Sequence, residues 1–222
     1  MKLLHQQDMK YKLVIFDFDG TIADTSSGIL DAHQFTLRTM GKIVPCEERL
    51  RAVIGGNLFQ TYINDFGFDE VKAREAVRIY RERYANVGVH MATLYPGMHD
   101  LLRSLKERGC KIGVATLKAE KFAKLMLREL RIFEFFDSVC GMDNQDISSK
   151  TDLILKCCSL CHVDVTDSVL VGDSNNDLIG AQEAGIDFIG VTYGFGFNDN
   201  ENYCFNRGES TEQVLSLMQL ND

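Results

Sequence analysis

Two aspartates, one residue apart, follow an apolar segment near the start of the chain. Residues 13–16 read Leu-Val-Ile-Phe, which suits a buried strand, and Asp17, Phe18, Asp19, Gly20 and Thr21 come next. A buried acidic pair is costly unless a cation or a reaction needs it. A turn at Gly20 would bring both side chains into one pocket, with Asp17 as nucleophile and Asp19 as its proton partner. The alternative is a strand end that carries two solvated aspartates.

Later segments add the groups that hold a phosphoryl group. The apolar segment 112–115 ends at the hydroxyl of Thr116, and Lys150 lies among small residues where a helix is expected to begin. A third apolar segment, 168–172, leads into Asp173 and Asp177. In chain order these are an acidic pair, a hydroxyl, a lysine and a second acidic pair. This set of groups can bind a phosphoryl group beside a divalent metal ion.

The elements that must position these groups alternate between strands and helices. Strands are expected over 111–115, 138–140, 168–172 and 187–191, and helices over 98–108, 119–130, 151–161, 176–184 and 211–220. Ser210 begins a capping-box pattern that opens the last helix. Such alternation predicts an α/β fold with a parallel sheet covered on both faces. The reactive residues follow strands, at the edge where open parallel sheets bind ligands.

A block of helical patterns separates the first strand from the second. Helices are expected over 22–40, 45–53, 57–66 and 69–87, with Thr25 or Ser26 as the N-cap of the first. Helices in one block, with no strand between them, should form a small bundle. Pro96 and Gly97 mark the return to the α/β part.

Together these motifs resemble the haloacid dehalogenase-like hydrolase superfamily, in its phosphoglycolate phosphatase-like branch. The matching positions are residues 17–21, Thr116, Lys150 and residues 172–177, and the resemblance spans residues 11–220. It implies a Rossmann-like parallel sheet core, residues 1–22 and 95–222, with an inserted all-helical cap domain, residues 23–94. It also implies a phosphatase that acts on a small phosphomonoester, for which phosphoglycolate is the reference substrate.

The resemblance also implies roles for the site residues. Asp17 would attack phosphorus and form an aspartyl-phosphate. Asp19 would protonate the leaving oxygen and then take a proton from the hydrolytic water. Thr116 would donate a hydrogen bond to a phosphoryl oxygen, and Lys150 would neutralise the charge that develops during transfer. Dehalogenase relatives lack the second aspartate, so Asp19 favours phosphate chemistry.

A divalent cation is expected because carboxylates must approach a phosphate dianion. Mg²⁺ prefers oxygen ligands, and the resemblance supplies the Asp17 and Asp173 side chains and the Asp19 backbone carbonyl. Asp177 would orient these ligands or Lys150. The alternative for Asp177 is a carboxylate that only favours the N-terminal dipole of its helix.

Substrate choice should depend on the cap. Arg51, Gly55, Gly56 and Asn57 form a glycine-rich turn between expected cap helices, placed to face the leaving group, although a simple interhelical connection is the alternative.

Four further positions bear on the branch within the family. Many relatives have Asn after the second-motif hydroxyl, where this chain has Leu117, so a contact there must use the backbone N–H. Lys118 keeps a frequent family lysine, but a solvated helix start explains it equally well. β-Phosphoglucomutase-like relatives carry a cap histidine where this chain has Ile29, which weakens the mutase interpretation. His33, the nearest histidine, is interpreted as a partly buried helix residue.

Composition limits the partners. The net charge of −8 argues against a nucleic-acid partner, but not against an anionic small substrate, because a lysine and a metal can reverse the local field. No apolar segment reaches membrane-spanning length, and the first ten residues lack the apolar core of a signal peptide. We therefore expect a cytoplasmic protein. The sequence does not indicate an oligomeric state.

The seven cysteines include a Cys-x-x-Cys-His pattern, typical of haem attachment, at residues 158–162. The favoured interpretation is a helix, residues 151–161, whose small apolar side chains face the core, with all thiols reduced.

Two alternative functions stay open. One is pyrophosphatase or β-phosphoglucomutase-type activity on the same fold. The other is a non-catalytic phospho-acceptor domain of the response-regulator type, which the acid Asp19 and the helical insertion both disfavour.

Overall fold

A six-stranded parallel sheet forms the centre of the computed structural model, which describes residues 9–143, 148–198 and 203–219. The sheet order is β5-β4-β1-β6-β7-β8. The strands are β1 (Leu13–Phe16), β4 (Lys111–Ala119), β5 (Ser138–Met142), β6 (Ser168–Gly172), β7 (Asp187–Val191) and β8 (Asn206–Gly208). The central strand β1 pairs with β4 on one side and β6 on the other, so the ends of these three strands lie side by side.

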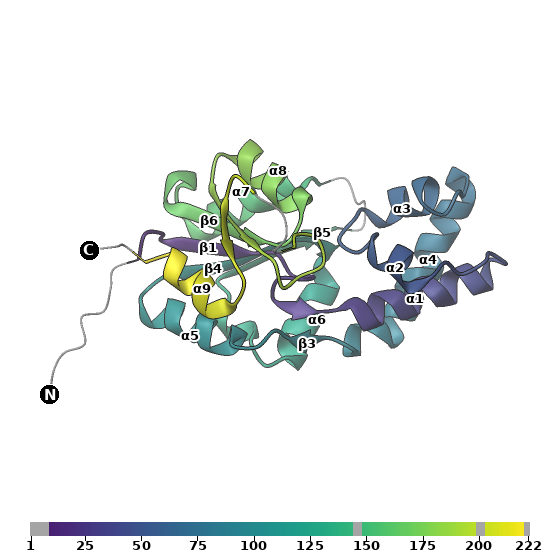
Figure 1. Ribbon diagram of the computed structural model, residues 1–222, viewed down its shortest axis with the longest axis horizontal. Helices are drawn as coiled ribbons and strands as arrows, with labels where there is room; N and C mark the ends of the chain where they lie inside the picture. Colours follow the sequence, from purple (N-terminus) through teal and green to yellow (C-terminus); the bar gives the residue numbers. More distant parts are fainter. Residues whose placement is uncertain (1–8, 144–147, 199–202, 220–222) are drawn as a thin grey trace, which may run out of the picture.

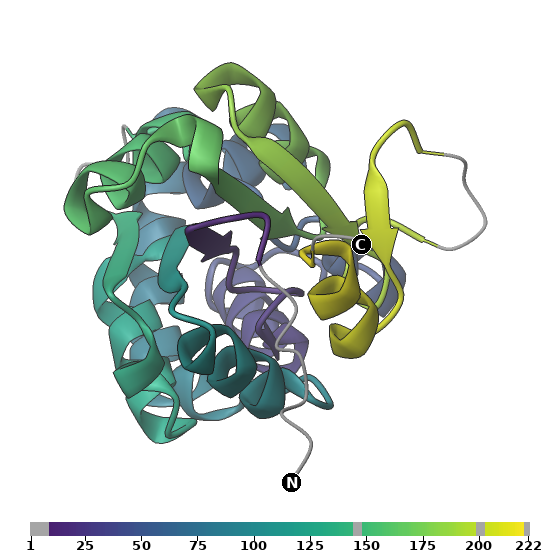
Figure 2. The ribbon, with the colours of Figure 1, turned by 90° about the vertical axis from the view of Figure 1, so that its left-hand side faces the viewer.

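Helices cover both faces of this sheet (Figure 2). One face carries α5 (Met98–Glu107), α6 (Glu120–Glu129) and α9 (Thr211–Leu217), and the other carries α7 (Lys150–Cys161) and α8 (Asn175–Ala184). Alternate residues of β1 pack into the two hydrophobic cores, one on each face of the sheet. Val14 and Phe16 pack into the larger cluster with α5 and α6, while Leu13 and Ile15 pack with α7 and α8. The predicted α/β fold, with a parallel sheet covered on both faces, is confirmed.

The four α-helices between residues 24 and 93 gather beyond one end of the sheet (Figure 1). We call α1 (Ser26–Thr39), α2 (Glu47–Arg51), α3 (Leu58–Asn64) and α4 (Glu70–Asn86) the helical bundle. The rings of His33, Tyr62, Phe66 and Tyr80 pack together inside it. A short antiparallel pair, β2 (Ala23–Asp24) with β3 (Thr93–Leu94), joins the two passages of the chain between bundle and sheet. The division at residues 23–94 stays a prediction.

The first predicted helix begins too early, which is the main correction to the sequence-based elements. Residues 23–24 form β2, and α1 begins at Ser26. Thr25 occupies the N-cap position, as expected, but its side chain does not cap the helix. It donates a hydrogen bond to Asp19 Oδ1 at 2.5 Å instead, while Asp24 Oδ1 accepts from the Ser26 backbone N–H at 2.9 Å. Contact with the acidic pair therefore takes precedence over local capping at Thr25.

Among the other predicted elements, strands 168–172 and 187–191 are confirmed as β6 and β7, while several others differ in their ends. Strand 111–115 extends to residue 119, and the short strands β2, β3 and β8 were not expected. Short 3-10 helices lie at Gly88–His90, Phe133–Phe135 and Val165–Asp167. The core-facing interpretation of the cysteine-rich helix is confirmed, because Cys157, Cys158 and Cys161 are buried in α7. The described chain contains no helix that is both long enough and apolar enough to cross a membrane.

Candidate active site

The residues predicted from sequence converge on one cavity at the ends of the central strands. Asp17 follows β1, Thr116 lies in β4 and Asp173 follows β6, and these strands are neighbours in the sheet. Lys150 is the first residue of α7, and Asp177 lies in the first turn of α8. All five line a cavity of about 400 Å³, together with Asp19. The parallel topology thus gathers groups that are far apart in the sequence.

The turn at Gly20 brings the two aspartates of the first motif to the same cavity, as predicted. Gly20 has a φ of +83°, a conformation that side chains with a Cβ rarely adopt. A Cβ at this position would also lie 2.2 Å from Asp173 Oδ2. Only glycine therefore allows the loop after β1 to approach Asp173 this closely. Asp17 and Asp19 are both buried, so the alternative of a solvated strand end is wrong.

Lys150 forms a buried bridge between two carboxylates. Its Nζ lies 2.5 Å from Asp17 Oδ1 and 2.6 Å from Asp177 Oδ1. Burial lowers the pKa of Lys150, but the two carboxylates outweigh this effect and the net pKa is raised above its ordinary value, so the ammonium stays charged. Asp177 Oδ2 accepts from the Ser174 backbone N–H at 3.0 Å and from the Ser174 hydroxyl at 2.7 Å. Asp177 therefore fixes both Lys150 and the start of α8.

Asp17, Asp173 and Asp177 form a cluster in which one oxygen from each lies within 4.8 Å of the others. The backbone N–H groups of Phe195 and Gly196 donate to Asp173 Oδ2 at 2.6 and 3.3 Å and fix its orientation. Burial, with the neighbouring carboxylates, raises the pKa of Asp17 to about 7, against the lowering effect of Lys150, and that of Asp173 to about 8. A hard cation with oxygen ligands would relieve this repulsion, so the donor set fits Mg²⁺.

Asp19 has a separate set of partners. Its Oδ1 lies 3.0 Å from Lys118 Nζ, in addition to its contact with Thr25. Lys118 Nζ also donates to the Tyr84 hydroxyl of α4 at 2.8 Å. The interpretation of Lys118 as a solvated helix start is wrong, because the residue lies in β4 and its side chain is only 6% exposed. Its spacing of two residues after Thr116, at the same strand end, was the available signal.

Thr116 is buried beside the cluster. Its Oγ1 accepts a hydrogen bond from the Lys118 backbone N–H at 3.2 Å, which leaves the hydroxyl proton for another acceptor. Leu117 also lines the cavity, as does Met142. A contact from the Leu117 backbone N–H to a phosphoryl oxygen stays a prediction.

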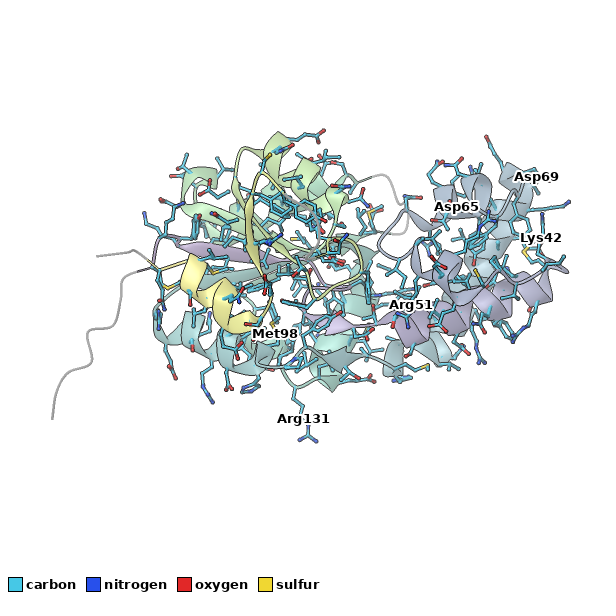
Figure 3. The ribbon with its side chains drawn as sticks, viewed as in Figure 1. Lys42, Arg51, Asp65, Asp69, Met98 and Arg131 are labelled. Carbon is cyan, nitrogen blue, oxygen red and sulfur yellow. The ribbon has the colours of Figure 1, made fainter. Side chains whose placement is uncertain are left out.

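The predicted turn of the bundle lines the same cavity as the carboxylate cluster. Arg51, Gly55, Gly56 and Asn57 all line the cavity. Gly55 contacts the first turn of α8 directly, because its carbonyl accepts a hydrogen bond from Asn176 Nδ2 at 3.3 Å. Asn57 caps α3 through the Gln60 backbone N–H at 3.1 Å, and Arg51 Nε donates to Glu47 Oε1 at 2.8 Å. Figure 3 labels Arg51 near the junction of bundle and sheet, whereas Lys42 and Asp69 lie at the far end of the bundle.

His33 borders the cavity but belongs to the aromatic core of the bundle. Its side chain is buried, and Nδ1 lies 3.2 Å from the Tyr62 hydroxyl. Burial lowers the pKa of His33 to about 4, so the ring is neutral near pH 7. Ile29 occupies the position where mutase-like relatives carry a histidine, and it offers the cavity only an apolar side chain.

Comparisons with known proteins agree with this geometry. Residues 14–191 match the model of the family described as haloacid dehalogenase-like hydrolase. A 5'-nucleotidase from Pseudomonas aeruginosa is 34% identical over 192 residues, which cover 86% of this chain and 87% of the relative. The pyrophosphatase PpaX from Bacillus cereus is 28% identical over 186 residues, which cover 83% and 85%. A haloacid dehalogenase-like family hydrolase from Streptococcus pneumoniae superposes with a TM-score of 0.86 at 28% identity, over 95% of this chain and 99% of that structure.

Proposed function

Because the chain belongs to the haloacid dehalogenase-like hydrolase family and is a phosphatase of that family, we propose that it hydrolyses a small phosphomonoester through an aspartyl-phosphate on Asp17. The arrangement of the cavity carries this proposal. The Asp17 carboxylate contacts the buried ammonium ion of Lys150 and belongs to the carboxylate cluster. The carboxyl group of Asp19 lines the same cavity but is not part of that cluster. Phosphoglycolate remains the reference substrate.

In the first half-reaction, an Asp17 carboxylate oxygen attacks phosphorus while the ester oxygen leaves with its bonding electrons. Oδ1 of Asp17 contacts Lys150, and its Oδ2 has no hydrogen-bond partner among the described residues. Oδ2 is therefore the oxygen that we assign to the attack. The Lys150 ammonium and the Thr116 hydroxyl line the cavity and would donate hydrogen bonds to the phosphoryl oxygens.

Asp19 moves the protons. It donates a proton to the leaving ester oxygen in the first half-reaction and accepts one from the attacking water in the second. Asp17, Asp173 and the backbone carbonyl of Asp19 would hold Mg²⁺, while Asp177 would orient Lys150, which it contacts at 2.6 Å, and the start of α8. When bound, Mg²⁺ would neutralise charge on the phosphoryl oxygens. We propose Mg²⁺ as the cofactor on the strength of this all-oxygen donor set.

The alternatives differ in their support. Pyrophosphatase activity stays open, because one relative bears that name. Mutase activity is disfavoured by Ile29 and by the burial of His33 in the bundle core. Membership of a phosphatase family argues against a non-catalytic phospho-acceptor domain. A cytoplasmic location also remains a prediction.

Turnover of p-nitrophenyl phosphate tests the proposed function. We expect release of p-nitrophenolate that requires Mg²⁺ and stops when a chelator is added, because the carboxylate cluster repels a phosphate dianion without a cation. The same assay on a panel of phosphorylated metabolites and pyrophosphate would rank the substrates. Absence of Mg²⁺-dependent turnover on every compound would contradict the proposal.

Arg51→Ala is expected to change substrate preference more than the maximal rate. Arg51, from the bundle, lines the same cavity as the cluster, and its guanidinium forms a hydrogen bond with Glu47. The selectivity between two metabolites should change by about tenfold, in line with loss of one charged contact. Measuring kcat/KM across the panel checks this. Equal losses for all substrates would contradict the assignment of this turn to leaving-group recognition.

A further inference from the structure

Lys118 is a buried ammonium ion that the proposed mechanism leaves without a role. Its side chain is 6% exposed, and that of its partner Asp19 is 9% exposed. Burying an ammonium ion is costly unless strong partners compensate for lost hydration. Here the partners are one oxygen of Asp19, at 3.0 Å, and the hydroxyl of Tyr84, at 2.8 Å. A residue kept at such cost, in contact with the proton-transfer group, points to a function at that group.

The contacts to Asp19 are one-sided. Lys118 and Thr25 both bind Oδ1. Within the described residues, Oδ2 accepts no hydrogen bond, although Asp19 lines the cavity. Two donors on one oxygen fix the rotation of the carboxyl group and leave the other oxygen for the substrate. Oδ2 is therefore the oxygen that we assign to proton exchange with the ester oxygen and with water.

Lys118 is itself held by the helical bundle. Tyr84 accepts its hydrogen bond, and the ammonium lies 4.6 Å from the centre of the Tyr84 ring. The Tyr84 hydroxyl in turn donates to the sulfur of Met126 in α6 at 3.5 Å, so its orientation is fixed. The stacked ring of Tyr80 supports Tyr84 from within α4. The contact from Tyr84 through Lys118 to Asp19 thus connects the bundle to the proton-transfer group.

We propose that Lys118, held by Tyr84, is a positioning residue that aims Asp19 Oδ2 at the leaving oxygen and stabilises the Asp19 carboxylate as the proton departs. This inference rests on the proposed function. As the ester P–O bond breaks, its electron pair goes to the ester oxygen, which takes the proton from Asp19 Oδ2. The attacking water later returns a proton to Oδ2 while its oxygen bonds to phosphorus, and the acid is restored. Lys118 keeps its own protons throughout.

The test compares two aryl phosphates that differ only in the stability of the leaving anion. p-Nitrophenolate leaves readily without a proton, whereas the phenolate of phenyl phosphate depends strongly on one. Because kcat/KM covers steps only up to departure of the leaving group, the ratio of the two kcat/KM values isolates the acid. General-acid assistance is worth about 10²–10⁴-fold in rate.

Lys118→Met should lower kcat/KM for phenyl phosphate at least about tenfold more than for p-nitrophenyl phosphate, because part of the acid assistance is lost. Asp19→Asn should shift the ratio in the same direction and further. The double variant should match Asp19→Asn alone, since Lys118 acts through Asp19. Tyr84→Phe keeps the buried ring and removes only the hydroxyl, so it should give a smaller selective loss even if Lys118→Met folds poorly.

Lys124→Met is the matched control, because Lys124 forms a lysine–carboxylate pair with Glu120 at 2.6 Å outside the cavity. It should leave both rates unchanged. Equal losses on the two substrates in Lys118→Met would instead assign Lys118 to phosphate binding or to stability, and would overturn the inference while leaving the proposed function intact. Additive losses in the double variant, or no selective loss in Tyr84→Phe, would also overturn it. No turnover by the wild-type protein would overturn both.

Discussion

Replacing Asp17 by asparagine is expected to reduce kcat by about 10⁴-fold or more, the largest effect of any single substitution in the cavity. Asparagine preserves the size of the side chain, but its amide oxygen is a poor nucleophile and cannot form the acyl phosphate. The variant also loses one anionic partner of Lys150, whose contact with Asp177 at 2.6 Å remains. The change therefore removes the attacking group while the surrounding network is retained.

A direct measurement follows the covalent intermediate. Wild-type protein mixed with phosphate-labelled substrate and quenched in acid should retain label on the protein, whereas the Asp17→Asn protein should retain none. Asp100→Asn provides the control, because Asp100 is an exposed aspartate of α5 whose side chain is 71% accessible. It should label and turn over like wild type. Label on the Asp17→Asn protein, or turnover close to that of wild type, would remove the basis for an aspartyl-phosphate.

The residues that follow strands were predictable because local spacing alone places them. Asp17, Thr116 and Asp173 come directly at the ends of apolar segments, and parallel pairing of β4, β1 and β6 makes those ends meet. Local spacing alone did not predict the role of Lys150, which was inferred from its place in the chain between Thr116 and Asp173. The Ser149–Asp152 capping box then explains locally why α7 begins where it does and places Lys150 at its first residue.

Lys118 and Thr25 were not assigned because their partners lie on other elements. Tyr84, in α4, is 34 residues from Lys118 in sequence, so the spacing of Lys118 after Thr116 indicates the strand end but not burial against α4. Thr25 looked like an ordinary N-cap, since threonine before a helical segment usually has that role. Its contact with Asp19 depends on the turn at Gly20 and on β2. The edge strand β8 was missed because its sequence, Asn-Arg-Gly, lacks apolar alternation.

Mg²⁺ is expected to stabilise the protein against unfolding far more near pH 8 than near pH 5. In cation-free protein the pKa values of Asp17 and Asp173 are raised to about 7 and about 8, whereas an aspartate in the unfolded chain titrates near 4. Between these values the folded state binds more protons than the unfolded state, so the free energy of unfolding falls as pH rises from about 4 to about 8. A bound cation favours both carboxylates in their charged form and so restores the lost stability at high pH. Near pH 5 the cation must first displace protons from the folded protein.

Thermal unfolding midpoints measured across this pH range, with a chelator and with Mg²⁺, test the prediction. Asp173→Asn is the informative variant, because asparagine can keep the hydrogen bonds from the Phe195 and Gly196 backbone N–H groups while it removes the titrating charge. Its unfolding midpoint in chelator should fall less between pH 5 and pH 8 than that of wild type, and it should lose most of the Mg²⁺ response. A Mg²⁺ response that is independent of pH, or equal in wild type and Asp173→Asn, would place any cation away from this cluster. The pKa values of both aspartates are raised chiefly by burial, which is costly for two charged carboxylates. We infer that a bound cation compensates for this cost, and such a result would contradict that inference.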